Sequence, residues 1–298
     1  MTLTIASSLD DILIGLAAGA RPIAGGTDLV VGSRQGKGQL PETLIAIDRV
    51  AELAAIDKGD AETRLGSGVT HARLMTDPVV VDHFTAIADA AALVGSPATR
   101  NVGTIGGNVM NGSPAMDTGA PLVVLGAKAE LASTSGTRLV GLDELWTGPG
   151  STSAEPNELC TALLVPNPAP NNASAYVRLE YRRAMEIAIV GAAAAVELDG
   201  DTIASVRVAL TAVAPTIIEV SGLDAVTGSA LNEATLAQIA EIASEQASPI
   251  SDLRASDRYR RHTIGVMASR AVDAAARRAA GETISVPVNR ALGIGAAQ

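Results

Sequence analysis

Two glycine-bearing loops constrain this chain more than any other feature. The first is Ala24-Gly25-Gly26-Thr27-Asp28-Leu29, and the second is Thr104-Ile105-Gly106-Gly107-Asn108. Paired glycines let main-chain N–H groups converge on an anion, and a neighbouring hydroxyl can donate once more. Neither loop fits Gly-x-Gly-x-x-Gly or the P-loop pattern, so those nucleotide sites are excluded. An ordinary Gly-Gly turn is the alternative for either loop alone, whereas the two together favour a dinucleotide shared between them.

Composition limits how such a ligand is held and which partners are possible. Of the 298 residues, 47% are hydrophobic and only 2% aromatic, so aliphatic side chains and backbone must hold any planar cofactor. The net charge of −10 argues against nucleic acid as a partner, because phosphate neutralisation needs basic patches. One cysteine, Cys160, excludes an internal disulfide and an iron–sulfur cluster held within this chain. Without a secretory signal or a long apolar run, we expect a cytoplasmic protein with no membrane insertion.

Local patterns predict a helix and two strands around the first loop, followed by a mixed segment. The expected helices cover 9–18 (capped by Ser8), a short stretch after Asp28, a short stretch after Thr70, 78–93 and 117–125. The expected strands are 21–23, 43–47 and 158–165, with hairpins turning at 59–60 and 135–136. Residues 96–117 show no periodicity, which predicts an irregular functional loop.

A change in sequence pattern after residue 165 predicts a separate C-terminal domain. Residues 166–173 are rich in proline and asparagine and read as a linker. Three strands (176–180, 187–198 and 203–213) and two helices (233–247 and 256–279) are expected after it, which is an antiparallel sheet backed by helices. The predicted boundaries are 1–57 and 58–168 for two subdomains and 174–290 for the C-terminal domain.

Two charged positions are candidates for contact with a dinucleotide. Asp117 follows the second loop, and its carboxylate can accept from ribose hydroxyls; a helix N-cap is the alternative. Arg178 opens the C-terminal domain with Arg182 and Arg183. A cation near the N1–C2=O edge of a flavin stabilises the anionic reduced ring, and the alternative is a solvated strand end.

No catalytic side chains emerge from the sequence. His71, His83 and His262 share no metal-ligand spacing, and Cys160 lies in an apolar stretch that predicts a buried structural thiol. There is no nucleophile–base pair, metal cluster or carboxylate dyad, so we predict no catalytic residue and no metal site. A bound cofactor must then do the chemistry.

Four segments together resemble one protein family. Residues 21–29, residues 104–108 with the following Ser113-Pro114-Ala115-Met116-Asp117, residues 182–191 and residues 249–261 are similar to the flavin-carrying medium subunits of the molybdenum hydroxylases. This family includes xanthine dehydrogenase, carbon monoxide dehydrogenase and aromatic N-heterocycle hydroxylases. Order and spacing match over nearly the whole chain.

The resemblance implies the fold and the cofactor site. The fold is α+β: a two-subdomain, PCMH-like FAD-binding fold followed by a C-terminal α+β domain with an antiparallel sheet and helices. One FAD would be bound non-covalently, because neither loop carries the His or Cys of covalent relatives. Ile187 stands where some relatives hold a tyrosine against the ring. The implied cofactor-binding residues are Arg21, Pro22, Ile23, Ala24, Gly25, Gly26, Thr27, Asp28, Leu29, Val94, Gly95, Thr104, Gly106, Gly107, Asn108, Asp117, Leu159, Cys160 and Arg178.

The resemblance also implies partners. The chain would pass electrons from [2Fe–2S] clusters through FAD to an external acceptor. A small [2Fe–2S] subunit and a large molybdopterin subunit would carry the other cofactors, in a dimer of heterotrimers. Two alternatives stay open at this point: a stand-alone flavoprotein dehydrogenase or oxidase, and a non-catalytic nucleotide-binding protein.

Overall fold

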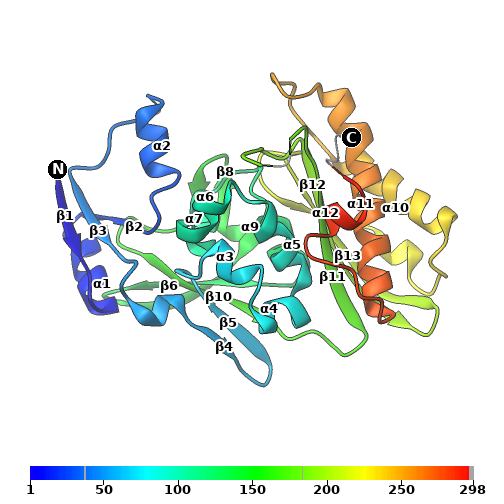
Figure 1. Ribbon diagram of the computed structural model, residues 1–298, viewed down its shortest axis with the longest axis horizontal. Helices are drawn as coiled ribbons and strands as arrows, with labels where there is room; N and C mark the ends of the chain where they lie inside the picture. Colours follow the sequence, from blue (N-terminus) through cyan, green and yellow to red (C-terminus); the bar gives the residue numbers. More distant parts are fainter. Residues whose placement is uncertain (37, 183, 295–298) are drawn as a thin grey trace.

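Three main sheets follow one another along the chain, with a small two-stranded ribbon beside the second. The structure is a computed structural model that describes residues 1–36, 38–182 and 184–294. The N-terminal sheet (blue) lies at one end, the second sheet in the middle, and the C-terminal sheet with its long helices at the other end (Figure 1). None of the helices in the described ranges is both long enough and apolar enough to cross a membrane.

The first sheet is small and parallel, in the order β1–β3–β2. Its elements are β1 (Thr2–Ile5), α1 (Leu9–Ala17), β2 (Arg21–Ile23), α2 (Leu29–Arg34), β3 (Thr43–Ala46) and the 3-10 helix η1 (Ala51–Ala54). Ser8 caps α1 as predicted, in a capping box with Asp11. The strand β1 was not predicted, because all four of its residues are exposed and only pairing with β3 orders them.

The middle sheet is antiparallel, in the order β4–β5–β10–β6–β7. Its strands are β4 (Ile56–Lys58), β5 (Glu62–Gly66), β6 (Lys128–Ser133), β7 (Gly136–Gly141) and β10 (Leu159–Pro166). A short ribbon of β8 (Trp146–Gly148) and β9 (Ser151–Thr152) follows helix α9 (Leu142–Leu145). Both predicted hairpins are confirmed. The last strand of this part, β10, lies at the centre, where it pairs with β5 and β6.

Six short helices cover this sheet, and two predictions about them are wrong. They are α3 (His71–Leu74), α4 (Pro78–His83), α5 (Thr85–Leu93), α6 (Pro97–Val102), α7 (Ile105–Met110) and α8 (Gly119–Val124). The single helix expected over 78–93 breaks at Phe84, whose backbone has a non-helical φ of −130° and whose ring is buried. The irregular run expected over 96–117 contains α6 and α7, because Ser96 and Thr104 cap them.

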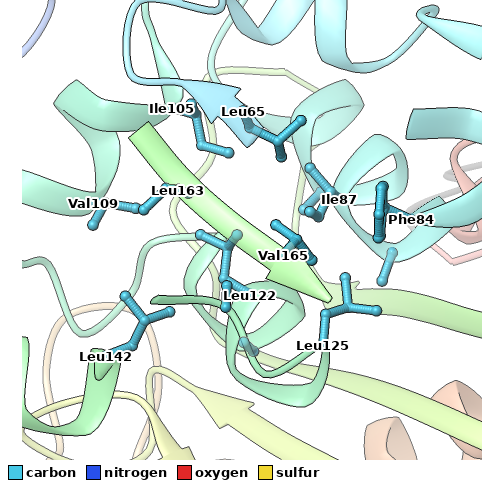
Figure 2. Packing of buried hydrophobic residues seen from close by; sticks show 14 of the residues in the cluster. Leu65, Phe84, Ile87, Ile105, Val109, Leu122, Leu125, Leu142, Leu163 and Val165 are labelled. Carbon is cyan, nitrogen blue, oxygen red and sulfur yellow. The ribbon is translucent and has the colours of Figure 1, made fainter. Parts of the chain in front are cut away.

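The core between these helices and the sheet is mostly aliphatic. Figure 2 shows Leu65, Ile105 and Leu163 converging there, with Ile87 and Val165 beside them. The second glycine loop forms α7, so the same packing that makes the core also fixes the loop.

The C-terminal part is an antiparallel sheet in the order β11–β12–β13–β14, as the α+β prediction requires. Its elements are β11 (Asn172–Leu179), β12 (Val190–Asp199), β13 (Thr202–Thr211), β14 (Ile218–Glu219), η2 (Leu223–Val226), α10 (Glu233–Gln246), α11 (Asp257–Ala279) and α12 (Val288–Ala291). The three strands and two long helices that were predicted are confirmed, while β14 and α12 are additions. Residues 167–171 join β10 to β11 inside the predicted linker. The domain boundaries themselves stay a prediction.

Candidate functional site

The first glycine loop packs against the residues that lead into the second. A Cβ added to Gly25 would lie 2.0 Å from the carbonyl oxygen of Val102, and one added to Gly103 would lie 3.6 Å from the Oγ1 of Thr27. Only a residue without a side chain allows this approach at position 25. The first loop therefore packs on the residues that lead directly into the second.

Three main-chain N–H groups of the first loop have no partner among the described residues. Between β2 and α2, the N–H groups of Gly25, Gly26 and Thr27 donate to no other backbone group in the described part of the chain. Gly26 has a φ of +66°, in the left-handed region that glycine adopts without steric cost. All three residues are half-buried rather than sealed in the core. Three successive unpaired donors at such a place fit the pyrophosphate of a dinucleotide.

The second loop uses its donors internally. The Gly106 N–H donates to the carbonyl of Ser67 at 2.9 Å, and the Gly107 N–H donates to Thr104 Oγ1 at 3.1 Å. A Cβ on Gly106 would lie 2.4 Å from the Cβ of Ser67, so this glycine is required for packing. Asn108 accepts a hydrogen bond from the buried Thr118 hydroxyl at 2.6 Å. The N–H groups of Gly106 and Gly107 are thus used within the protein, unlike those of Gly25 and Gly26.

Asp117 lies in a buried ion-pair network and not at a helix cap. Its two carboxylate oxygens accept from Arg178 Nη1 and from the Tyr176 hydroxyl, each at 2.8 Å. Arg178 also pairs with Glu180 and is 0% exposed. The N-cap alternative is wrong, because α8 begins at Gly119 with Thr118 before it.

This network determines the net charge of Arg178 together with its partners. Burial raises the pKa of Asp117, and Arg178 and Tyr176 partly offset that. Burial also opposes the charge of Arg178, but Asp117, Tyr176 and Glu180 together hold its pKa above the usual value. With two carboxylates against one guanidinium, Arg178 adds no net positive charge to its surroundings. Of its predicted companions, Arg182 is exposed and pairs with Glu186, and Arg183 lies outside the described residues.

The Val94–Gly95 turn lies where the middle and C-terminal parts meet. Gly95 has a φ of +51°, and its carbonyl accepts from the N–H of Met185 at 3.1 Å. Arg100 Nη1 donates to the Val94 carbonyl at 2.9 Å. The sequence analysis named the turn but missed Arg100. Its position between the Val94–Gly95 turn and the second loop is the signal that could have found it.

Leu159 and Cys160 face the core. Each is 4% exposed, and they belong to two different clusters: Leu159 packs beside the first sheet and Cys160 inside the middle part. The Cys160 thiol donates to the Ala162 carbonyl at 3.6 Å. The structural role predicted for Cys160 agrees with this placement, and neither side chain offers surface to a ligand.

Cys160 is expected to resist alkylation in the folded protein. Burial, with a smaller contribution from Glu130, raises the pKa of its thiol to about 12, and the thiolate is the reactive species. Intact-mass spectrometry after iodoacetamide should show no adduct on the native chain and one adduct after unfolding in urea. A native protein that is alkylated as fast as free cysteine would contradict this burial.

Two further polar groups lie beneath the second loop. The Nδ1 of His71 and the Oγ of Ser67 are buried and have no hydrogen-bond partner in the described part of the chain. Burial, with Arg100, lowers the pKa of His71 to about 4, so its ring is neutral at pH 7. Groups of three His, Cys, Asp or Glu side chains that could bind a metal are absent from the ranges that the structure describes. Two hollows of the surface beside the C-terminal sheet contain none of the predicted site residues.

Comparisons with protein families match both parts of the chain. A family described as the FAD binding domain in molybdopterin dehydrogenase matches residues 1–168, and the CO dehydrogenase flavoprotein C-terminal domain matches residues 175–275. The putative xanthine dehydrogenase FAD-binding subunit of Escherichia coli K12 is 33% identical over 266 residues, which is 88% of this chain and 91% of the relative. The carbon monoxide dehydrogenase medium chain of Afipia carboxidovorans is 32% identical, over 90% of this chain and 93% of the relative.

Solved structures agree with the sequence relatives. Carbon monoxide dehydrogenase from Hydrogenophaga pseudoflava superposes with a TM-score of 0.88 at 30% identity, over 93% of this chain and 98% of the other. Quinoline 2-oxidoreductase from Pseudomonas putida 86 gives a TM-score of 0.88 at 28% identity, over 94% of this chain and 98% of the other. The predicted fold class is thereby confirmed.

Proposed function

The chain belongs to the family of FAD-binding subunits of molybdopterin dehydrogenases, and from this premise we propose how it holds FAD and where its electrons go. It is the FAD-carrying subunit of an oxidoreductase complex, in which the molybdenum and iron–sulfur centres are on other subunits. The relatives are medium chains and FAD subunits of multi-subunit dehydrogenases, so partner subunits follow from membership.

The observation that carries the site assignment is the packing of the first loop on Val102 and Gly103, which lead into the second loop. FAD, when bound, supplies the two-electron redox chemistry. The unpaired N–H groups of Gly25, Gly26 and Thr27 would hold its pyrophosphate. Thr104, Gly107 and Asn108 would line the opposite side, where Gly107 is exposed. The Val94–Gly95 turn would lie against the ring, where Met185 brings in the C-terminal part.

A more specific proposal concerns the partner subunits and the electron acceptor of this chain. We propose that a small [2Fe–2S] subunit delivers electrons to this chain and that a large molybdopterin subunit chooses the substrate, in a dimer of heterotrimers. This division is supported by relatives that share one FAD-subunit fold although their names refer to xanthine, carbon monoxide and nicotinate. An external acceptor then takes the electrons from this chain. The cytoplasmic location stays a prediction.

The purified chain is expected to be yellow and to contain one FAD that acid precipitation releases into the supernatant. Non-covalent binding follows because neither loop offers a His or Cys for attachment. A candidate heterocycle or purine should leave this flavin oxidised, and reduction should begin only when both partner subunits are added. Visible absorbance spectra before and after each addition measure both points.

Three outcomes would contradict this function. Colourless protein that takes up no added FAD would favour a non-catalytic nucleotide-binding protein. Reduction of the flavin by substrate without partners would favour a stand-alone dehydrogenase. Yellow colour in the acid pellet would show a covalent bond.

A further inference from the structure

In the described part of the chain, arginines with buried side chains are neutralised, whereas a half-buried arginine at the proposed cofactor site is not. Arg178, Arg260 and Arg278 have buried side chains, and each pairs with an aspartate at 2.6 to 2.8 Å. Arg100 is only half-buried, yet no carboxylate of the described residues lies within 4.0 Å of its guanidinium. An arginine that is partly removed from water without a counter-ion is costly, so its charge calls for a ligand or a function.

Arg100 points into the turn that is proposed to hold the flavin ring. Its Nη1 donates to the carbonyl of Val94 at 2.9 Å and lies 3.5 Å from the carbonyl of Gly95. The same Gly95 carbonyl accepts from the N–H of Met185. The guanidinium is thus anchored by neutral carbonyl groups, which fix its position without cancelling its charge.

The charged group that acts most on Arg100 is itself a cation. Burial lowers the pKa of Arg100, and the positive charge of Arg290 lowers it further. Arg290 is held nearby because the side chain of Asn289 exchanges hydrogen bonds of 3.0 and 2.8 Å with the backbone of Arg178. Arg290 is exposed, and it too has no carboxylate partner within 4.0 Å in the described ranges. The neighbouring His71 ring is neutral at pH 7 and adds no charge to this group.

We propose that Arg100, supported by Arg290, supplies the uncompensated positive charge at the ring end of the site and favours the reduced, anionic form of the bound flavin. This role was expected of Arg178, whose charge is cancelled by Asp117 and Glu180. The inference rests on the proposed function, because it requires FAD in this site. When FAD takes up two electrons and one proton it becomes FADH⁻, and the added negative charge is what a nearby cation stabilises.

A competing explanation is that Arg100 only clamps the Val94–Gly95 turn. Two substitutions separate charge from geometry. Arg100→Gln keeps a side-chain donor but removes the charge, whereas Arg100→Lys keeps the charge and loses the planar fork. Arg290→Gln removes the second cation without touching the turn. Arg277→Gln is the matched control, since Arg277 is neutralised by Glu282 and Asp273.

The test is a redox titration of the FAD-loaded full chain with dithionite, which gives the midpoint potential of the two-electron couple. In Arg100→Gln, we expect the affinity for reduced flavin to fall about tenfold relative to oxidised flavin, which lowers the potential by about 30 mV. Arg290→Gln should also lower the midpoint potential, but by less than Arg100→Gln does. For Arg100→Lys and Arg277→Gln, the affinity for reduced relative to oxidised flavin should stay within about twofold of the wild-type value.

The possible results distinguish failure of the electrostatic role of Arg100 from failure of the proposed function. An unchanged potential in Arg100→Gln, or an equal fall in Arg100→Lys and Arg100→Gln, overturns the electrostatic role. If Arg100→Gln does not retain FAD, Arg290→Gln decides, and an unchanged potential there overturns it as well. Wild-type protein that binds no FAD contradicts the proposed function instead, and it is recognised before any variant is compared.

Discussion

Replacing Arg178 by alanine is expected to lower the free energy of unfolding by about 3–5 kcal/mol, because the change leaves buried carboxylates without their cation. Arg178 is 0% exposed, and Asp117 and Glu180 both depend on it. Removing one partner of a buried pair costs more than the pair itself contributes, since the remaining charge stays out of water. Urea denaturation followed by circular dichroism measures the change.

An exposed ion pair supplies the control. Arg277→Ala removes a guanidinium that is 41% exposed, and we expect a loss of about 0–1 kcal/mol. The double variant Arg178→Met with Asp117→Leu should recover part of the loss relative to Arg178→Ala, because it removes one of the stranded charges as well. Equal stability of Arg178→Ala and Arg277→Ala would contradict the importance of the buried network.

The network also ties two parts of the molecule together. Asp117 precedes α8 in the middle part, while Arg178 and Tyr176 belong to β11 of the C-terminal sheet. A second buried pair crosses the same junction, where Asp89 of α5 accepts from both terminal nitrogens of Arg278 at 2.6 and 3.1 Å. Loss of Arg178 should therefore loosen the junction at which the Val94–Gly95 turn meets Met185.

Features with a local physical cause were predictable from the sequence. The caps at Ser8 and Thr70 and both hairpins of the middle sheet depend on residues within a few positions of each other. The break at Phe84 was not predictable in this way. The residues on both sides of it continue a helical pattern, and the non-helical φ of Phe84 accompanies burial of its ring in the core.

The candidate site was predictable as a set of segments and not as a set of contacts. The glycines of both loops were evident, but the sequence does not reveal that Gly25 faces the Val102 carbonyl while Gly106 faces Ser67. Asp117 and Arg178 were both selected for a cofactor, yet they bind each other across 61 positions of sequence. Such pairing is fixed by the packing of two sheets, which no local pattern encodes.

The first loop yields the sharpest test of the site, because adding one methyl group should separate the two loops. In Gly25→Ala the new Cβ would lie 2.0 Å from the oxygen and 2.4 Å from the carbon of the Val102 carbonyl. Backbone atoms cannot rotate away as a side chain can, so the loop must shift, at a cost of about 1–3 kcal/mol in stability. The unpaired N–H groups of Gly25, Gly26 and Thr27 would then no longer converge on one point.

The expected result is loss of FAD from a protein that still folds. Each charge-assisted hydrogen bond contributes about 1.5–3 kcal/mol, so two misplaced donors would weaken binding by a factor of about 10² to 10⁴. Gly32→Ala is the matched control, since an added Cβ in α2 meets no atom within 4 Å. Gly106→Ala should instead reduce stability through Ser67, with FAD affected only as far as α7 moves. FAD content per chain, determined on the purified variants together with thermal unfolding, separates these effects. A Gly25→Ala protein with full FAD content would show that the donors of the first loop do not hold the pyrophosphate, because their convergence cannot survive the displacement that this contact demands.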